Sequence, residues 1–100
     1  MKNITLFCAN GMSTSLLVSK MEKAVKEKGL EYQIAAHPVS EINKYGADAD
    51  MILLGPQVAF KLKQFKALFP NKPVETINMQ DYGLMRGDKI IARVQEVLGE

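Results

Sequence analysis

The residues of this sequence that could perform chemistry are concentrated in one stretch, Cys8 to Ser15 (CANGMSTS), which contains the only thiol of the chain. The stretch also contains a glycine and three hydroxyl side chains, and it connects an apolar run to a segment of helical periodicity. A loop over the first turn of a helix presents unpaired backbone N–H groups and the positive end of the helix dipole. The pattern therefore predicts a cradle for a dianion such as phosphate. Its residues would be Ala9, Asn10, Gly11, Met12, Ser13, Thr14 and Ser15.

Cys8 would be a nucleophile in the same electrostatic field, because the N-terminus of a helix lowers the pKa of a nearby cysteine. A partly exposed thiolate beside an anion site can attack phosphorus, so we predict that Cys8 carries a phosphoryl group. The competing interpretation is structural. A single Cys at the end of a strand is often a small buried apolar side chain, and hydroxyl residues after a glycine often only cap a helix.

Two nucleotide-binding motifs are excluded, because the loop lacks both the Gly-Lys-Ser/Thr of a Walker loop and the glycines of a dinucleotide fingerprint. The spacing resembles the Cys-x5-Arg-Ser/Thr loop of low-molecular-weight tyrosine phosphatases, but Thr14 stands where that family has arginine. Without a bidentate arginine clamp, attack on a stable phosphate ester should be poor. Asp81 and Tyr82 follow the fourth predicted strand, where a phosphatase would place its general acid. A cysteine phosphatase that lacks the usual arginine is therefore the alternative to a phosphoryl carrier.

The elements that position these residues follow from short apolar runs that alternate with longer segments of helical period. The first helix is expected to begin at Ser13 as its N-cap and to stop at Gly29 in a left-handed conformation. Strands are predicted at residues 4–8, 32–37, 50–54 and 74–77, and helices at 13–28, 56–69 and 90–98, with a weakly patterned short helix at 40–45.

Four strands that are each followed by a helix predict an α/β fold. We expect a four-stranded parallel sheet of order 2-1-3-4 with helices on both faces, as in flavodoxin-like and low-molecular-weight-phosphatase-like proteins. Ligands of such sheets bind beyond the carboxyl ends of the strands, at the switch point between strands 1 and 3. The residues expected at that edge are Cys8, His37, Gln57 with the preceding residues 55–56, and the segment 78–82 that contains Tyr82.

Length and composition indicate one ordinary globular domain, residues 1–100, with 47% hydrophobic and 24% charged residues. A formal charge of +2 argues against nucleic acid as a partner. One Cys and one His cannot form an intrachain disulfide or a Cys/His zinc site, and we expect no metal and no cofactor. The lack of a second Cys also argues against a thiol-redox module, the third class considered. No apolar run is long enough for a signal peptide or membrane span, so we expect a cytoplasmic protein without direct membrane insertion.

Residues 6–18 (LFCANGMSTSLLV) are similar to the active-site segment of enzyme IIB of the bacterial phosphoenolpyruvate-dependent sugar phosphotransferase system, lactose/cellobiose/chitobiose class. The resemblance continues through LLGPQ (53–57), NKPVE (71–75) and YG (82–83), so it covers most of the chain in order. Asn78 departs from the acidic residue expected in cellobiose-type members, and Asp81 departs from an apolar one.

The resemblance implies a phosphotransferase that works in a relay. A phosphohistidine of enzyme IIA would phosphorylate Cys8, and the phosphocysteine would phosphorylate a sugar held by the membrane enzyme IIC during uptake. The loop from Ala9 to Ser15 would hold the phosphate oxygens, with Gln57 and Tyr82 at its rim. The protein would lie in the cytoplasm, peripheral to the inner face of the membrane through enzyme IIC. The sugar stays open, because its choice belongs to enzyme IIC.

Two further features have both a structural and a functional interpretation. His37, the only histidine, is expected near Cys8, but a His-Pro at the end of a strand is usually a loop residue, and a helix dipole can activate the thiol without it. The lysines of the first predicted helix form either a solvated face or a docking face for an acidic partner. They are Lys20, Lys23, Lys26 and Lys28.

Overall fold

A parallel sheet forms the centre of the computed structural model, which describes residues 1–9 and 15–100. Within these residues the strands are β1 (Lys2–Cys8), β2 (Tyr32–Pro38), β3 (Met51–Leu54) and β4 (Val74–Thr76). They lie in the order β2-β1-β3-β4, and every neighbouring pair is parallel, which confirms the predicted topology. Of the two inner strands, β3 is apolar and buried throughout, and β1 is buried from Ile4 to Cys8, as expected for the middle of a parallel sheet.

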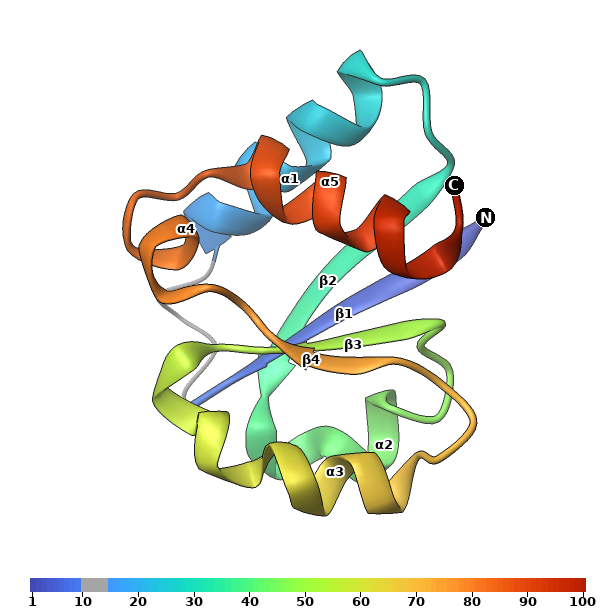
Figure 1. Cartoon of the computed structure of the whole chain (residues 1–100), viewed down its shortest axis with the longest axis vertical. Coiled ribbons are helices and arrows are strands. Elements are labelled where there is room, and N and C mark those ends of the chain that lie inside the picture. The colour runs from blue at the N-terminus through green and yellow to red at the C-terminus, as the bar shows by residue number, and fades with distance from the viewer. Residues whose placement is uncertain (10–14) are drawn as a thin grey trace.

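Helices cover both faces of the sheet, as predicted (Figure 1). On one side lie α1 (Ser15–Glu27), α4 (Met79–Gly83) and α5 (Gly87–Leu98), and on the other side lie α2 (Ile42–Tyr45) and α3 (Leu62–Leu68). Two 3₁₀ segments complete the order, η2 (Val39–Glu41) before α2 and η3 (Pro56–Lys61) before α3. The short helix predicted weakly at residues 40–45 is thus present as η2 followed by α2.

The strands divide the core into two clusters, because successive side chains of a strand point to opposite faces. Ile4 and Leu6 of β1 pack in the cluster under α1 and α5, together with Met21 and Ile91. Phe7 is at an odd position, so its side chain points to the other face and packs in the cluster on the α2 and α3 side. The parity of a residue in β1 therefore decides which helical layer it meets.

The pairing of α1 with α5 depends on a close backbone approach. A Cβ added at Gly87 would lie 2.5 Å from the carbonyl carbon of Lys20 and 2.7 Å from the amide nitrogen of Met21. No side chain fits there, so the glycine lets the first turn of α5 rest on the backbone of α1. The amphipathic prediction for α1 is confirmed, since its inward residues are buried and Gly29 ends it with a φ of 67°.

Two elements differ from the sequence predictions. The helix expected over residues 56–69 is η3 followed by α3, with a kink at Val58 (φ −117°, ψ 21°). The helix α4 was not predicted, because its five residues are too short to show a helical period. The Asn78 side chain caps α4 by accepting hydrogen bonds from the amides of Gln80 (2.9 Å) and Asp81 (3.2 Å).

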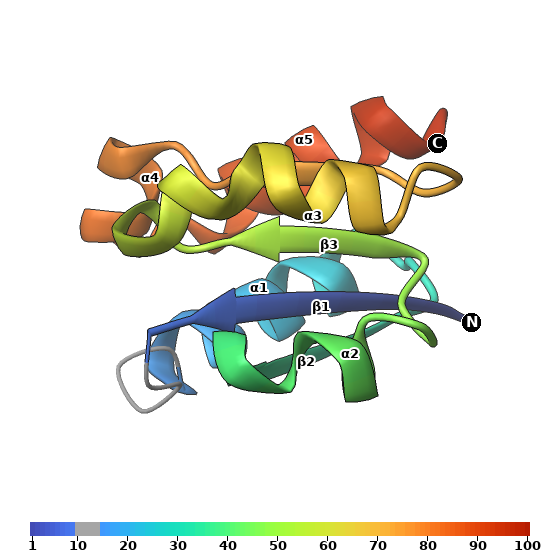
Figure 2. The same cartoon turned by 90° about the horizontal axis from the view of Figure 1, so that it is seen from below.

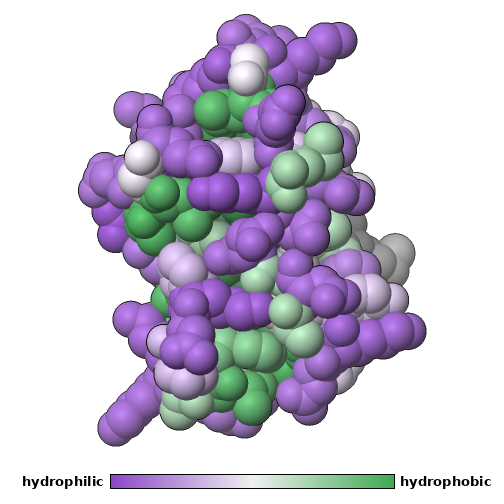
Figure 3. Space-filling view, turned by 90° about the vertical axis from the view of Figure 1, so that its right-hand side faces the viewer, coloured by the Kyte–Doolittle hydropathy of each residue, from purple (hydrophilic) through white to green (hydrophobic). Residues whose placement is uncertain are grey.

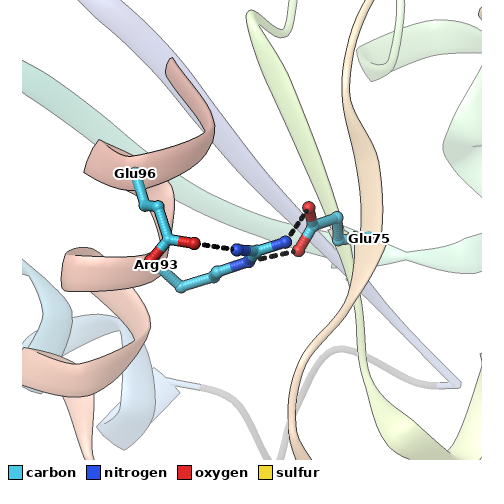
Figure 4. Close-up of polar contacts among 3 residues, drawn as sticks. All are labelled: Glu75, Arg93 and Glu96. Atoms are coloured by element: carbon cyan, nitrogen blue, oxygen red, sulfur yellow. Dashed lines mark hydrogen bonds and ion pairs between the residues drawn. The ribbon is translucent and has the colours of Figure 1, made fainter. Parts of the chain in front are cut away.

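The edge strand β4 is tied to α5 by a polar cluster (Figure 4). Arg93 of α5 donates two hydrogen bonds to the carboxylate of Glu75, each 2.9 Å long, and it also pairs with Glu96. A planar, bidentate pair of this kind fixes the angle between strand and helix as well as their separation. None of the helices in the described part of the chain is long and apolar enough to cross a bilayer.

Candidate functional site at the carboxyl edge of the sheet

The carboxyl edge of the sheet collects the segments that the sequence predicted there. Figure 2 shows β1 and β3 running in the same direction and ending on the same side of the molecule. Cys8 is the last residue of β1, and Phe7 is in register with Leu54, so Gly55 lies beside Cys8. A hydrogen bond of 3.0 Å from the amide of Gly55 to the carbonyl of Phe7 continues the pairing past the end of β3.

Cys8 is buried, with 2% of its surface exposed, whereas we expected a partly exposed thiol. The parity of β1 places Cys8 on the same face as Ile4 and Leu6, the face that α1 and α5 cover. Cys8 is therefore the last residue of β1, and its thiol is buried within the carboxyl edge of the sheet. The predictions for residues 10–14 of the cradle lie outside the described residues, while Ala9 and Ser15 on either side of them are exposed.

Gly55 and Gln57 lie near the Cys8 sulfur. A Cβ added at Gly55 would lie 3.1 Å from Cys8 Sγ and 2.9 Å from Gln57 Oε1. The two atoms are thus both close to one point on the α1 side of the sheet. The Gln57 carboxamide is thus near the thiol, on the edge of the sheet where the sequence analysis expected Gln57.

His37 lies on the opposite face of the sheet from Cys8. It is in register with Phe7, and its ring stacks on Tyr45 of α2 with the centroids 3.6 Å apart and the planes 3° from parallel. Residues paired across parallel strands share a face, so His37 belongs to the α2 side, as Phe7 does. The geometry therefore does not support a Cys–His pair, and His37 belongs to β2, whereas the structural interpretation expected a loop residue.

Tyr82 reaches the edge from α4, and its ring packs against the cluster under α1 and α5. Its hydroxyl oxygen is buried, and no donor or acceptor within residues 1–9 and 15–100 hydrogen-bonds to it. Asp81, the neighbour that a phosphatase would use as general acid, faces Arg86 with 3.6 Å between the charged atoms. The strand-4 edge thus presents a paired carboxylate and a buried phenol.

Large apolar side chains are exposed on the segments of this edge, which sequence analysis missed. They are Leu16 at the start of α1 (54% exposed), Phe60 of η3 (78%), Met79 of α4 (74%) and Leu84 directly after α4 (63%). In Figure 1 three segments lie on the left side, namely the start of α1, the helix α4, and η3 ahead of α3. Leu16 falls out of phase with the buried residues of α1, whereas α4 has no buried residues against which a phase could be read.

The end of the molecule opposite the carboxyl edge carries both termini. Figure 3 shows a mainly hydrophilic surface there with several apolar patches. The lysines of α1 that were considered for docking are all exposed. Among the described residues, no three His, Cys, Asp or Glu side chains are grouped so that they could hold a metal ion.

The parallel sheet of order 2-1-3-4, with a cysteine at the end of its first strand, places the chain among flavodoxin-like and low-molecular-weight-phosphatase-like folds. The lactose-specific IIB component domain of the phosphotransferase system of Streptococcus pneumoniae has this fold, with a TM-score of 0.84 over 96% of each chain and 14% identity. The family model described as "PTS system, Lactose/Cellobiose specific IIB subunit" matches residues 3–93. The chain belongs to this family of sugar phosphotransferase components.

Individual relatives agree with the family. The chain is 47% identical to a galactose-specific EIIB component of Lactococcus lactis subsp. cremoris and 46% identical to a cellobiose-specific one of Lactococcus lactis subsp. lactis, with 97% of this chain and 96% of each relative covered. It is 40% identical to an oligo-beta-mannoside-specific EIIB component of Bacillus subtilis, over 89% and 88%. The solution structure of a cellobiose-specific IIB component of Borrelia burgdorferi matches with a TM-score of 0.74 and 36% identity, over 91% of this chain and 85% of that one.

Proposed function

We propose that this protein is the phosphoryl carrier of a sugar phosphotransferase system and that Cys8 carries the group. The observation that carries the proposal is the place of Cys8. In a chain of the lactose/cellobiose-specific IIB family, the only thiol ends the central strand β1 at the switch point of the sheet. In open parallel sheets this is where ligands bind.

The first transfer loads Cys8 from a phosphohistidine of enzyme IIA. The sulfur attacks phosphorus, an S–P bond forms as the N–P bond breaks, and the thiol proton is transferred to the leaving imidazole nitrogen. The phosphoryl group carries two negative charges both before and after the transfer, so the site must supply hydrogen-bond donors to its oxygens. Backbone N–H groups of the predicted loop, Ala9 to Ser15, would supply such donors.

The second transfer unloads Cys8 to a sugar held by enzyme IIC. A sugar hydroxyl attacks the phosphorus, the S–P bond breaks, and the proton of that hydroxyl restores the thiol. Phosphocysteine must survive between the two steps, which a site that excludes water supports. The burial of Cys8, with 2% of its surface exposed, suits this requirement.

The exposed apolar side chains of the carboxyl edge form the docking surface for the protein that delivers the phosphoryl group. Specific protein interfaces have an apolar core, and Phe60 and Met79 are each exposed by about three quarters. We expect Phe60→Ser to slow phosphoryl transfer from enzyme IIA by about tenfold at subsaturating concentrations. Leu68→Ser is the matched control, since Leu68 is an exposed leucine (47%) at the far end of α3. Equal rates for the two variants would contradict this docking surface.

The sugar is carried by the partner and not encoded in this chain. Relatives of nearly equal identity, 47% and 46%, are named for galactose and for cellobiose. We therefore expect the cognate sugar to follow enzyme IIC. The protein would act in the cytoplasm, at the inner face of the membrane, where enzyme IIC presents the sugar.

Intact-mass spectrometry tests the proposal. The protein is incubated with phosphoenolpyruvate, enzyme I, HPr and a IIA of the cellobiose/lactose type, with Cys8→Ser in parallel. We expect one added phosphoryl group on the wild type, none on Cys8→Ser, and loss of the group when enzyme IIC and sugar are added. No adduct with several IIA proteins would contradict the carrier function. Steady turnover of an aromatic phosphate ester would instead favour the cysteine phosphatase.

A further inference from the structure

The carboxamide of Gln57 and the sulfur of Cys8 are neighbours across Gly55. Both Gln57 Oε1 and Cys8 Sγ lie close to the point where a Cβ of Gly55 would be, at 2.9 Å and 3.1 Å. The two atoms are therefore no more than 6.0 Å apart, the sum of these two distances. Residue 55 has no side chain, and a Cβ there would lie within 3.1 Å of both atoms.

The local backbone directs Gln57 back toward the sulfur. After β3 the chain turns at Gly55 and Pro56, and the amide of Val58 donates a 3.0 Å hydrogen bond to the carbonyl of Gly55. This turn makes η3 start immediately at the edge of the sheet. Gln57 is exposed, so burial in the core does not explain why its amide lies over residue 55.

We propose that the Gln57 carboxamide donates a hydrogen bond to a phosphoryl oxygen on Cys8. This inference rests on the proposed carrier function and adds a phosphoryl-binding residue from outside the loop. The Gln57 carboxamide is close enough to the sulfur for this hydrogen bond. A phosphoryl oxygen on Cys8 plus one hydrogen bond of about 2.9 Å extends on the order of 6 Å from the sulfur, which equals the upper limit of the Oε1–Sγ separation. Gln57 would thus approach the phosphoryl group from the Gly55 side of the sulfur.

A carboxamide suits both states of Cys8. It carries an acceptor oxygen and a donor nitrogen, and a half-turn about its last torsion exchanges them at little cost. In the unmodified protein the oxygen is the atom near residue 55. After transfer the nitrogen would face the phosphoryl group. A carboxylate at this position has no donor and would repel the dianion.

Two substitutions of similar size separate these effects. Gln57→Met keeps the length of the side chain and removes the donor, and Gln57→Glu keeps the shape and adds a negative charge. Gln64→Glu, on exposed Gln64 of α3, is the charge-matched control. The equilibrium between phosphorylated IIA and this protein is measured by intact mass, and the phosphocysteine by its ³¹P chemical shift.

We expect Gln57→Met to lower the equilibrium constant for loading Cys8 by roughly tenfold, as loss of one hydrogen bond to a charged group does. Gln57→Glu should lower it further, and Gln64→Glu should match the wild type. The ³¹P shift should change in both Gln57 variants, and their melting temperatures without phosphate should equal that of the wild type. A normal constant and a normal shift in Gln57→Met would overturn the inference even if Gln57→Glu were impaired, because only charge would then matter. A wild type that takes no phosphoryl group would overturn the carrier function and this inference together.

Discussion

The space beside the Cys8 sulfur depends on Gly55, and Gly55→Ala tests that dependence with a single added carbon. The backbone of Gly55 (φ −62°, ψ 149°) is extended, and every L-residue adopts it without strain. Alanine should even stabilise the fold by about 0.4–1 kcal/mol through the unfolded chain. Any loss therefore comes from the contacts of the new methyl group.

The new methyl group would be too close to two side chains. It would lie 2.9 Å from Gln57 Oε1, 3.1 Å from Cys8 Sγ and 3.7 Å from Cys8 Cβ, against about 3.5–4.0 Å for a relaxed contact. The exposed end of Gln57 can swing away. The sulfur must shift by a few tenths of an ångström, which costs about 0.5–1.5 kcal/mol if it leaves its rotamer. This cost offsets the gain from alanine, so the free energy of unfolding should stay within about 1 kcal/mol of the wild type.

Phosphorylation should respond far more strongly than stability. The methyl group would crowd the side of the sulfur that faces Gln57, and it would push the Gln57 carboxamide away from the sulfur. We expect loading of Cys8 from phosphorylated IIA to fall at least about tenfold, which corresponds to ~1.4 kcal/mol. The two quantities are measured by urea denaturation of the unmodified protein and by intact mass after incubation with the donor.

Gly83→Ala is the matched control for this substitution. Gly83 ends α4, and a Cβ there would meet no atom within 4 Å, so loading should be unchanged. If Gly55→Ala were phosphorylated as fast and as fully as the wild type, the predicted effect of crowding the sulfur and displacing Gln57 would be wrong. A loss of stability above about 3 kcal/mol would show that Cys8 cannot move aside, and would refute the estimate for the sulfur.

Three further substitutions test packing and ionisation. Gly87→Ala should lower the free energy of unfolding, measured by urea denaturation, by about 1–3 kcal/mol or more, because its Cβ would lie 2.5 Å from the Lys20 backbone. A wild-type free energy of unfolding would contradict the close contact of α1 with α5. Tyr82→Phe should raise the free energy of unfolding by about 1 kcal/mol, since it removes a buried hydroxyl for which the described residues offer no hydrogen-bond partner. A clear decrease in the free energy of unfolding would instead show that this hydroxyl has a hydrogen-bond partner. Burial, together with a hydrogen bond to Glu100, raises the pKa of Tyr32 from 10.0 to about 12. The neutral phenol is thus favoured in the folded state, and its stabilising contribution is complete below pH 10 and lost as the pH rises toward 12. Tyr32→Phe should therefore show a flatter loss of stability between pH 10 and 12 than the wild type, and parallel profiles would contradict the assignment.

The strands and their order could be predicted because they depend on local patterns. The run from Met51 to Leu54 is apolar throughout, which is typical of a strand covered on both faces, and the structure has β3 there. Right-handed crossovers then leave few orders for four parallel strands. The stop of α1 at Gly29 was equally local, since a left-handed residue favours glycine.

Short and non-local features were out of reach of such patterns. The helix α4 has five residues and is fixed by the cap of Asn78 and by packing of Tyr82, neither of which produces a periodic signal. The kink in η3 and the exposure of Phe60 arise from how the chain leaves β3. The predicted partial exposure of Cys8 was wrong, because burial depends on the elements that meet at the edge and not on the loop sequence alone.

By itself the sequence determined the chemistry that is available, namely a single thiol between an apolar strand and a helix, and the edge of the sheet to which it belongs. Only the tertiary structure decided which side chains share that edge with the sulfur. Parity along the parallel strands sends His37 to the α2 face with Phe7 and leaves Cys8 on the other. A turn after β3, with no side chain at Gly55, brings Gln57 to the thiol from 49 positions along the chain. Contacts of this kind depend on the register between strands that are distant in sequence, which no local pattern contains.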